Sequence, residues 1–181
     1  MSTSVSYYLF DTAIGTCAIA WTERGVCGTS LPEPTPQETA ARIRRRHPDA
    51  REAAPSDDVR AAADAIVSLL DGEAASLTDV PLDESGIPEF HRRVYQVTRS
   101  IPAGETTTYG AIAQTLGDVR LAQEVGVALG HNPIPIITPC HRVLGADGKL
   151  VGFSAPGGVE TKRRMLLIEG ALPDEPLDLF E

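Results

Sequence analysis

Three alternating prolines between residues 32 and 36 divide the chain into a strand-forming start and a helix-forming remainder. Proline cannot donate a ladder hydrogen bond, so these residues end any sheet that precedes them. Residues 7–10 and 17–21 are rich in aromatic and apolar side chains and flank a short turn, which predicts a β-hairpin. With a further short strand over about residues 26–31, the start of the chain predicts a small antiparallel sheet.

The segment after the prolines is typical of two helices. Helix-forming residues run from 37 to 47 and include an arginine cluster within 42–46. We interpret this cluster as charges favoured by the macrodipole at a helix C-terminus, with a basic binding patch as the alternative. A second helix is predicted over residues 56–70, with Ser56 as its cap. We expect this half of the chain to support the fold rather than to carry chemistry.

The second half of the chain is expected to be mainly helical. Residues 81–88 combine acidic residues, glycine and proline, as is typical of a linker. A helix is then predicted over about residues 88–100, with Phe90, Val94 and Val97 buried at helical spacing.

Two further helices, over about residues 108–116 and 119–129, meet at the short turn Gly117-Asp118. A short glycine-containing turn between two helices is typical of a helix-turn-helix. We therefore predict an α+β fold, in which a small N-terminal antiparallel sheet with helices precedes a mainly helical C-terminal domain. That domain would contain the helix-turn-helix and a short active-site strand.

We expect a supporting domain with the linker at residues 1–85, a second domain at 86–171 and an acidic tail at 172–181. Charge is distributed unevenly over these parts. The whole chain carries a formal charge of −9, which opposes binding to DNA phosphates. Residues 86–170 hold nine Lys or Arg and seven Asp or Glu, a net charge of +2, whereas the remainder carries −11. Any binding of this domain to undamaged DNA should be weak and strongly salt-dependent.

Cysteine usage and hydropathy exclude several classes of protein. Cys17, Cys27 and Cys140 are an odd number without paired short spacing, which argues against a disulfide framework and a structural zinc site. No stretch approaches the ~20 apolar residues of a membrane span, and the N-terminus lacks a basic region followed by an apolar run. We expect no bound metal, no membrane contact and a cytoplasmic location.

The run at residues 139–143, Pro-Cys-His-Arg-Val, places a thiol, an imidazole and a guanidinium side by side. Only the thiolate is nucleophilic, and with an ordinary pKa of about 8.5 few cysteines are ionised at pH 7. Residues 134–138 are apolar and β-branched, which predicts a short buried strand with Cys140 at its end. Cys140 is therefore a candidate nucleophile, with a buried structural thiol as the alternative.

Several separated motifs resemble, in order and spacing, the O6-alkylguanine-DNA alkyltransferase family, also called the methylated-DNA–protein-cysteine methyltransferases. The resemblance covers roughly residues 86–171, and the N-terminal half matches only loosely. The motifs are Ile101-Pro102-Ala103-Gly104-Glu105-Thr106, Thr108-Tyr109-Gly110-Ala111-Ile112-Ala113, Val125-Gly126, Asn132-Pro133, residues 139–143, Gly148, Gly152-Phe153-Ser154 and Lys162 to Gly170.

The resemblance implies direct reversal of DNA damage. The methyl or larger alkyl group of O6-alkylguanine in double-stranded DNA would move irreversibly to Cys140, and O4-alkylthymine is a further candidate substrate. The target nucleotide would be flipped out of the stack to reach the cysteine. Nothing regenerates a thioether, so the resemblance implies a single turnover without a cofactor, and we expect a monomer.

The resemblance also implies roles for single residues. His141 and Glu169 match the pair that relays the cysteine proton, and Tyr109 matches the tyrosine that protonates the departing guanine. Without the resemblance, we would interpret His141 as a strand cap, Glu169 as a solvated helix end and Tyr109 as a packing residue. Arg142 should mainly organise the site by hydrogen bonding, and Asn132 should tie the DNA-reading helix to the reactive residue. The implied pocket residues are Val143, Phe153, Ser154 and Asn132, and the implied DNA contacts are Thr108, Arg120, Ala122, Gln123, Gly126 and Arg142.

The chain departs from the family pattern at two places. Gln123 stands where the family has an arginine that intercalates into DNA, and Glu124 follows it. Flipping would then be less efficient, or Arg120 would substitute for the arginine. The pair Ala155-Pro156 looks inserted in the active-site loop, so the size of the accepted alkyl group is open.

Two other functions compete with this interpretation. The first is a sensor that binds the lesion without removing it, like the alkyltransferase-like proteins, but those proteins lack the reactive cysteine. The second is a cysteine hydrolase that uses Cys140 and His141. We disfavour it because adjacent residues of a strand point to opposite faces.

Overall fold

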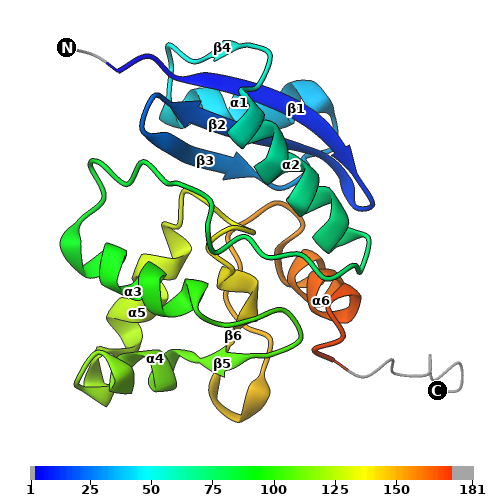
Figure 1. Cartoon of the computed structure of the whole chain (residues 1–181). Helices are drawn as coiled ribbons and strands as arrows, with labels where there is room; N and C mark the ends of the chain where they lie inside the picture. The colour runs from blue at the N-terminus through cyan, green and yellow to red at the C-terminus, as the bar shows by residue number, and fades with distance from the viewer. Residues whose placement is uncertain (1–2, 173–181) are drawn as a thin grey trace, which may run out of the picture.

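The computed structural model describes residues 3–172, so the expected acidic tail lies outside the described residues except for Leu172. An N-terminal sheet with two helices packs beside a mainly helical C-terminal half (Figure 1). This arrangement confirms the α+β fold class. Within residues 3–172, no helix is long and apolar enough to cross a membrane.

Four strands form the N-terminal sheet in the order β3-β2-β1-β4. β1 (Ser6–Thr12), β2 (Gly15–Thr22) and β3 (Gly25–Ser30) pair antiparallel, which confirms the predicted hairpin and the third strand. β4 (Arg51–Glu52) pairs parallel with β1 at the sheet edge. It was not predicted, because two residues are too few to show a period of two.

Each face of the sheet is covered by one helix, because successive side chains of a strand point to opposite faces. Ile19 packs with α2 (Asp57–Leu70), whereas Ala18 packs with α1 (Pro36–Arg46). Figure 1 shows these helices on opposite sides of the strands. Ser56 occupies the cap position of α2, as predicted, but its side chain makes no capping hydrogen bond.

The C-terminal half is built from helices with short connections (Figure 1). α3 (Glu89–Arg99) packs against α4 (Tyr109–Thr115) and α5 (Ala122–Gly130). A short 3-10 turn, η1 (Val119–Leu121), leads into α5, so the predicted helix-turn-helix pair is present. The last helix, α6 (Gly158–Ile168), packs against the segment that carries the reactive cysteine.

Helix α3 buries a face slightly different from the predicted one. Val94 is buried as expected, but Phe90 and Val97 are only partly buried. Tyr95 takes their place in the core, and its hydroxyl donates a hydrogen bond to the Ala128 carbonyl at 2.6 Å. Such a partner removes the usual cost of burying a hydroxyl group.

The segment 81–88, predicted as a linker, is bonded to the sheet along part of its length. The Val26 amide donates to the Pro81 carbonyl at 2.9 Å. Asp83 is buried and accepts a hydrogen bond from the Thr22 hydroxyl at 2.5 Å. The connection therefore holds the two halves of the chain in a defined arrangement.

Residues 134–138 do not form the predicted strand. The chain turns there, and Ile136 has a φ of 76°, in the left-handed region that β-branched residues rarely adopt. The cysteine lies on a 3-10 turn, η2 (Cys140–Arg142), rather than at a strand end. A short strand follows instead: β6 (Val143–Leu144) pairs parallel with β5 (Thr107–Thr108) at the start of the helix-turn-helix.

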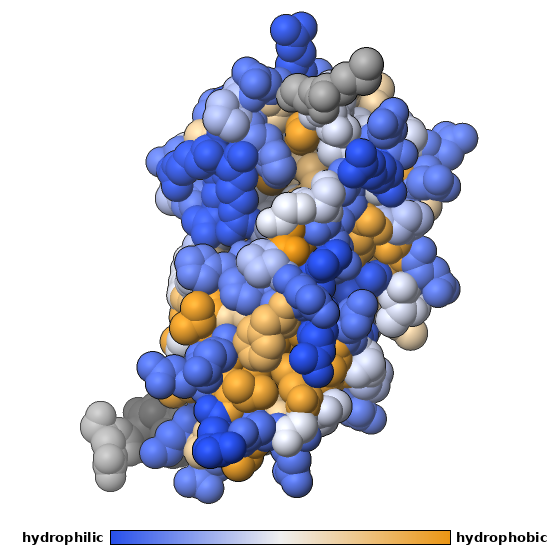
Figure 2. All heavy atoms as spheres, turned by 90° about the vertical axis from the view of Figure 1, so that its left-hand side faces the viewer, coloured by the Kyte–Doolittle hydropathy of each residue, from blue (hydrophilic) through white to orange (hydrophobic). Residues whose placement is uncertain are grey.

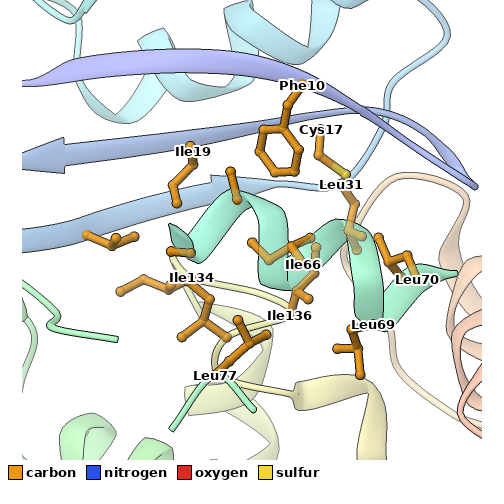
Figure 3. Packing of buried hydrophobic residues seen from close by; sticks show 14 of the residues in the cluster. Phe10, Cys17, Ile19, Leu31, Ile66, Leu69, Leu70, Leu77, Ile134 and Ile136 are labelled. Carbon is orange, nitrogen blue, oxygen red and sulfur yellow. The ribbon is translucent and has the colours of Figure 1, made fainter. Parts of the chain in front are cut away.

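The largest hydrophobic cluster joins both halves of the chain (Figure 3). Ile134 and Ile136, from the turn before the cysteine, pack with Ile66 and Leu69 of α2 and with Ile19 of the sheet. All five side chains are at most 2% exposed. The core of the N-terminal half thus anchors the segment that leads to Cys140, and this packing supports the unusual backbone of Ile136.

Candidate active site

Cys140 begins the η2 turn and is almost fully buried. Burial raises the pKa of the Cys140 thiol, although a hydrogen bond with Asn132 and the charge of Lys162 act against this effect. The cysteine is therefore protonated at rest. A reaction that needs the thiolate must supply a base.

Asn132 joins the end of the helix-turn-helix to the cysteine segment. Its Nδ2 donates to the Thr138 carbonyl at 2.8 Å, and its Oδ1 accepts from the Ile134 amide at 3.0 Å. Asn132 is itself buried two residues after α5 ends. This geometry matches the bridging role expected from the sequence.

His141, Arg142 and Glu169 form one buried hydrogen-bonded cluster. His141 Nε2 lies 2.7 Å from Glu169 Oε1, and Arg142 donates through Nε and Nη2 to the two Glu169 oxygens at 2.9 and 2.8 Å. Burial alone would raise the pKa of Glu169, but the hydrogen bonds from His141 and Arg142 outweigh it and lower this pKa to about 2. Glu169 is therefore ionised and holds both partners in place.

His141 has one ring nitrogen free to act as a base. Burial lowers the pKa of His141 in spite of Glu169, so the imidazole is neutral. Because a carboxylate only accepts hydrogen bonds, Nε2 carries the proton and Nδ1 is the acceptor. Within residues 3–172, Nδ1 is buried without a hydrogen-bond partner. A buried acceptor in the same turn as Cys140 is suited to taking the thiol proton.

The structure corrects the expected DNA contact of Arg142. The residue is only 7% exposed, and its Nη1 also donates to the Ile101 carbonyl at 2.7 Å. With Glu169 and Ile101 as partners, the guanidinium is used inside the protein and does not reach a phosphate. Its position agrees with the organising role that the sequence suggested.

Lys162 is a site residue that the sequence reasoning missed. It is fully buried on α6, and its Nζ donates to the Val143 carbonyl at 2.6 Å and to the Val151 carbonyl at 3.1 Å. The same nitrogen lies 5.9 Å from the ring centroids of both Tyr109 and Phe153. Burial lowers the pKa of Lys162 to about 8. The carbonyl of Val143, one of the implied pocket residues, therefore already accepts a hydrogen bond inside the protein.

A signal for Lys162 was present in the sequence. It precedes Met165 and Leu166 by three and four residues, and both of these side chains are fully buried. Residues at this spacing share one face of a helix. The lysine therefore lies on the buried stripe of α6, although the motif comparison gave it no role.

Tyr109 stands at the start of α4 with its hydroxyl near the active-site loop. Its Oη donates to the Val151 and Gly152 carbonyls at 3.3 and 3.4 Å, which are long hydrogen bonds. Burial, and then the nearby Cys140, raise the pKa of Tyr109, so the phenol keeps its proton. Thr108, expected to contact DNA, caps α4 by accepting the Ala111 amide at 3.1 Å, which leaves only its hydroxyl proton for an outside acceptor.

A cleft borders Cys140 between the two halves of the chain. Phe153 and Ser154 line it, as expected, and so do the two inserted residues that follow them. The Ser154 hydroxyl donates to the Gly130 carbonyl at 2.9 Å, which joins the loop to the end of α5. The insertion is thus part of the cleft wall and will influence the size of group that fits.

The helix-turn-helix carries little positive charge on its exposed side. The Arg120 side chain is 87% exposed, yet its guanidinium forms an ion pair with Asp118 that is 2.7 Å long at its shortest. Gln123 and Glu124 are both exposed on α5. The ion pair uses Arg120 Nε and Nη2, so Nη1 is still available to a phosphate, but the neighbouring carboxylate weakens the attraction.

Apolar side chains on the same unit are exposed instead. Val119 is 60% and Val127 52% exposed. Figure 2, which views the left-hand side of Figure 1, shows hydrophobic side chains gathering on the lower half of the molecule, over the C-terminal half of the chain. Of the other expected DNA contacts, Ala122 packs partly on the core, and Gly126 lies where an added Cβ would be 3.9 Å from the Tyr109 ring.

Comparison with known proteins places the C-terminal half in a described family. Residues 89–171 match the family described as 6-O-methylguanine DNA methyltransferase, DNA binding domain. Over 128 residues the chain is 44% identical to the methylated-DNA–protein-cysteine methyltransferase of Mycolicibacterium paratuberculosis. That alignment covers 70% of this chain and 76% of the relative.

Solved structures extend the similarity to the N-terminal half. The chain is similar to the O6-methylguanine methyltransferase of Mycobacterium tuberculosis, with a TM-score of 0.74 and 35% identity over 97% of each chain. It is also similar to Mycobacterium tuberculosis OGT in complex with DNA, with a TM-score of 0.75 and 34% identity. This match covers 92% of this chain and 93% of the other.

Proposed function

The chain belongs to the O6-methylguanine-DNA methyltransferase family, and from this premise we propose that Cys140 receives the alkyl group during direct-reversal repair of DNA. The activity is transfer of a methyl group from methylated DNA to a cysteine of the protein itself. One observation carries the assignment to Cys140: its thiol borders the cleft, next to a neutral His141 with a free, buried Nδ1.

The proposed reaction is a single in-line displacement. Cys140 Sγ passes its proton through a bridging water to His141 Nδ1, and the sulfur attacks the alkyl carbon. The new S–C bond forms as the bond from that carbon to guanine O6 breaks, and the electron pair stays on O6. Glu169 stabilises the resulting imidazolium. The product is a thioether that nothing regenerates, so each molecule acts once and consumes no cofactor.

Tyr109 is proposed to neutralise the departing guanine. Its raised pKa keeps the phenol protonated, and its present hydrogen bonds are long enough to be exchanged for a shorter one to the base. Charge that develops on O6 is stabilised by a donor already in position. The backbone amide of Ser154 is the second proposed donor to O6, with Phe153 and Asn132 shaping the pocket.

We also propose finer properties of the partner and the domains. The lesion is O6-alkylguanine in double-stranded DNA, with O4-alkylthymine as a second candidate. Residues 86–171 would bind DNA and accept the alkyl group, while residues 1–85 would support the fold. A monomer in the cytoplasm is the expected form.

The deciding experiment is intact-protein mass spectrometry after incubation with a duplex that carries one O6-methylguanine, followed by peptide mapping. We expect a gain of one methyl group per protein on the peptide that contains Cys140, and no gain with the unmodified duplex. Absence of any gain, together with tight binding to the lesion, would favour a sensor in which the cysteine is not activated.

Replacing Gln123 by arginine should speed repair of duplex DNA. An arginine can fill the gap left by a flipped base and adds a positive charge near phosphates. We expect the single-turnover rate with an O6-methylguanine duplex to rise several-fold, while the rate with free O6-benzylguanine stays the same. Gln37→Arg, at an exposed position of α1, is the matched control for the added charge. Equal gains with both substrates would contradict a role in flipping.

Binding to undamaged duplex should be weak and should fall steeply with salt. The working domain has a net charge of only +2, so few phosphate contacts are expected. Raising KCl from about 50 to about 200 mM should weaken binding about ten-fold, as expected for about two neutralised phosphates. Fluorescence anisotropy with a labelled duplex measures this, and an affinity that does not change with salt would exclude electrostatic binding.

The structure changes the argument against a cysteine hydrolase. On a strand, Cys140 and His141 would point to opposite faces, but they lie on a 3-10 turn, where successive side chains do not. That reason was therefore wrong. Family membership now argues against hydrolysis, and repeated turnover with a model ester would be the result in its favour.

A further inference from the structure

Helix α1 of the N-terminal half reaches the cleft beside Cys140 with two arginines. Arg42 and Arg46 are four residues apart, which places them on the same face of the helix, and both line the cleft. Arg42 Nη2 donates to the Ser154 carbonyl at 3.2 Å, and Arg46 Nη1 donates to the Asn132 carbonyl at 3.4 Å. These contacts connect the supporting half of the chain to two segments that border the reactive cysteine.

The Arg42 contact has the more defined geometry of the two. Its Nη1 donates to Glu33 Oε1 at 3.2 Å, and the side chains of Arg42 and Glu33 are 31% and 20% exposed. The guanidinium is a rigid fork, so an anchor on one arm restricts where the other arm can point. Glu33 therefore aims Arg42 at the loop that carries Ser154.

That loop needs an external support. Residues 149–154 have no regular secondary structure, so the backbone there has no hydrogen-bonded ladder to fix it. Two contacts hold Ser154: its hydroxyl donates to the Gly130 carbonyl, and its carbonyl accepts from Arg42. The first contact ties the loop to α5 and the second to α1.

We propose that Arg42 is a positioning residue for alkyl transfer, because it sets where the Ser154 amide and the Phe153 ring lie relative to Cys140. The inference deepens the proposed function and rests on it, since it takes Ser154 and Phe153 to contact the flipped base. Arg42 touches no reacting atom. A loop displaced by about 1 Å would misalign the base with the sulfur, and such misplacement slows a reaction strongly. The N-terminal half then takes part in the reaction through one side chain.

The test is Arg42→Gln, which cannot reach Glu33 and Ser154 together. Single-turnover rates with an O6-methylguanine duplex are measured over a range of concentrations. We expect the limiting rate constant to fall about ten-fold, while the half-saturating concentration changes less than about two-fold. Free O6-benzylguanine should show the same fall, because the loop contacts the base rather than the duplex. Arg42→Lys, which keeps the charge without the fork, should recover part of the rate.

Arg45→Gln is the matched control, because Arg45 is an exposed arginine of the same helix outside the cleft lining. Its rate constant should equal that of the wild type. Three results would overturn the proposal: an unchanged rate constant in Arg42→Gln, an equal loss in Arg45→Gln, or a change confined to the half-saturating concentration with the duplex. If Arg42→Gln proves unfolded by thermal melting, the rate of Arg42→Lys decides by the same criteria. A wild type that transfers no methyl group would instead refute the proposed function.

Discussion

Replacing Cys140 by alanine is expected to abolish methyl transfer and to leave the fold intact. The other two cysteines do not line the cleft, and burial raises the pKa of Cys17 to about 12 and that of Cys27 to about 11, so neither thiol is ionised near neutral pH. Loss of one buried sulfur should cost about 1 kcal/mol, which lowers Tm by about 2–4 °C for a chain of this size. The variant should still bind the lesion, since the other residues that line the cleft are unchanged.

Intact-protein mass spectrometry with an O6-methylguanine duplex measures the loss, and circular dichroism melting verifies the fold. Cys27→Ala is the matched control, since Cys27 on β3 is not itself a residue of the cleft lining, and the variant should gain one methyl group like the wild type. Residual transfer in the Cys140→Ala protein would assign the reaction to another cysteine.

Replacing Glu169 by glutamine should reduce both the transfer rate and the stability. The change leaves the Arg142 guanidinium buried without a counter-charge. Glutamine keeps only one acceptor oxygen for His141 and Arg142, and its NH2 group can only donate, so the tautomer of His141 is no longer fixed by a carboxylate. We expect a loss of about 3 kcal/mol in the free energy of unfolding, as for other broken buried ion pairs. The transfer rate constant should fall about 10²-fold, the usual scale for an impaired general base. Urea unfolding and single-turnover kinetics measure the two effects.

The pH dependence of the free energy of unfolding should distinguish the buried Glu169 carboxylate from exposed carboxylates such as Glu160. The pKa of Glu169 is depressed from an ordinary 4.5 to about 2 in the folded protein. The unfolded state therefore binds its proton first as pH falls, so the stabilisation is complete above about 4.5 and is lost as pH falls toward about 2. The Glu169→Gln protein should lack this component of acid unfolding. Glu160→Gln, an exposed change on α6, should keep the wild-type profile, and identical profiles in all three proteins would contradict the assignment.

The elements with strong local patterns could be predicted. The hairpin and the helices follow from alternation and capping, which depend on residues close together in the chain. The strand expected at 134–138 was wrong, because an apolar run indicates burial without fixing the direction of its hydrogen bonds. Ile134 and Ile136 are buried from a turn, where core packing outweighs the β preference of isoleucine.

The sequence by itself determined the chemical groups of the site. Cys140, His141 and Glu169 stand in separated motifs whose order and spacing identify the family, and the same comparison exposed Gln123 as a departure. Spacing along the chain carries this information directly. It requires no knowledge of which side chains are buried.

Only the tertiary structure decided how these groups are arranged. Packing of α6 against the η2 turn brings Glu169 to His141 across 28 residues of chain, leaves Nδ1 as the free acceptor and encloses Lys162. The contact of Arg42 with Ser154 spans 112 residues. Burial and hydrogen-bond partners set the protonation of each group, and both arise when distant segments pack together, so no local pattern of residues contains them.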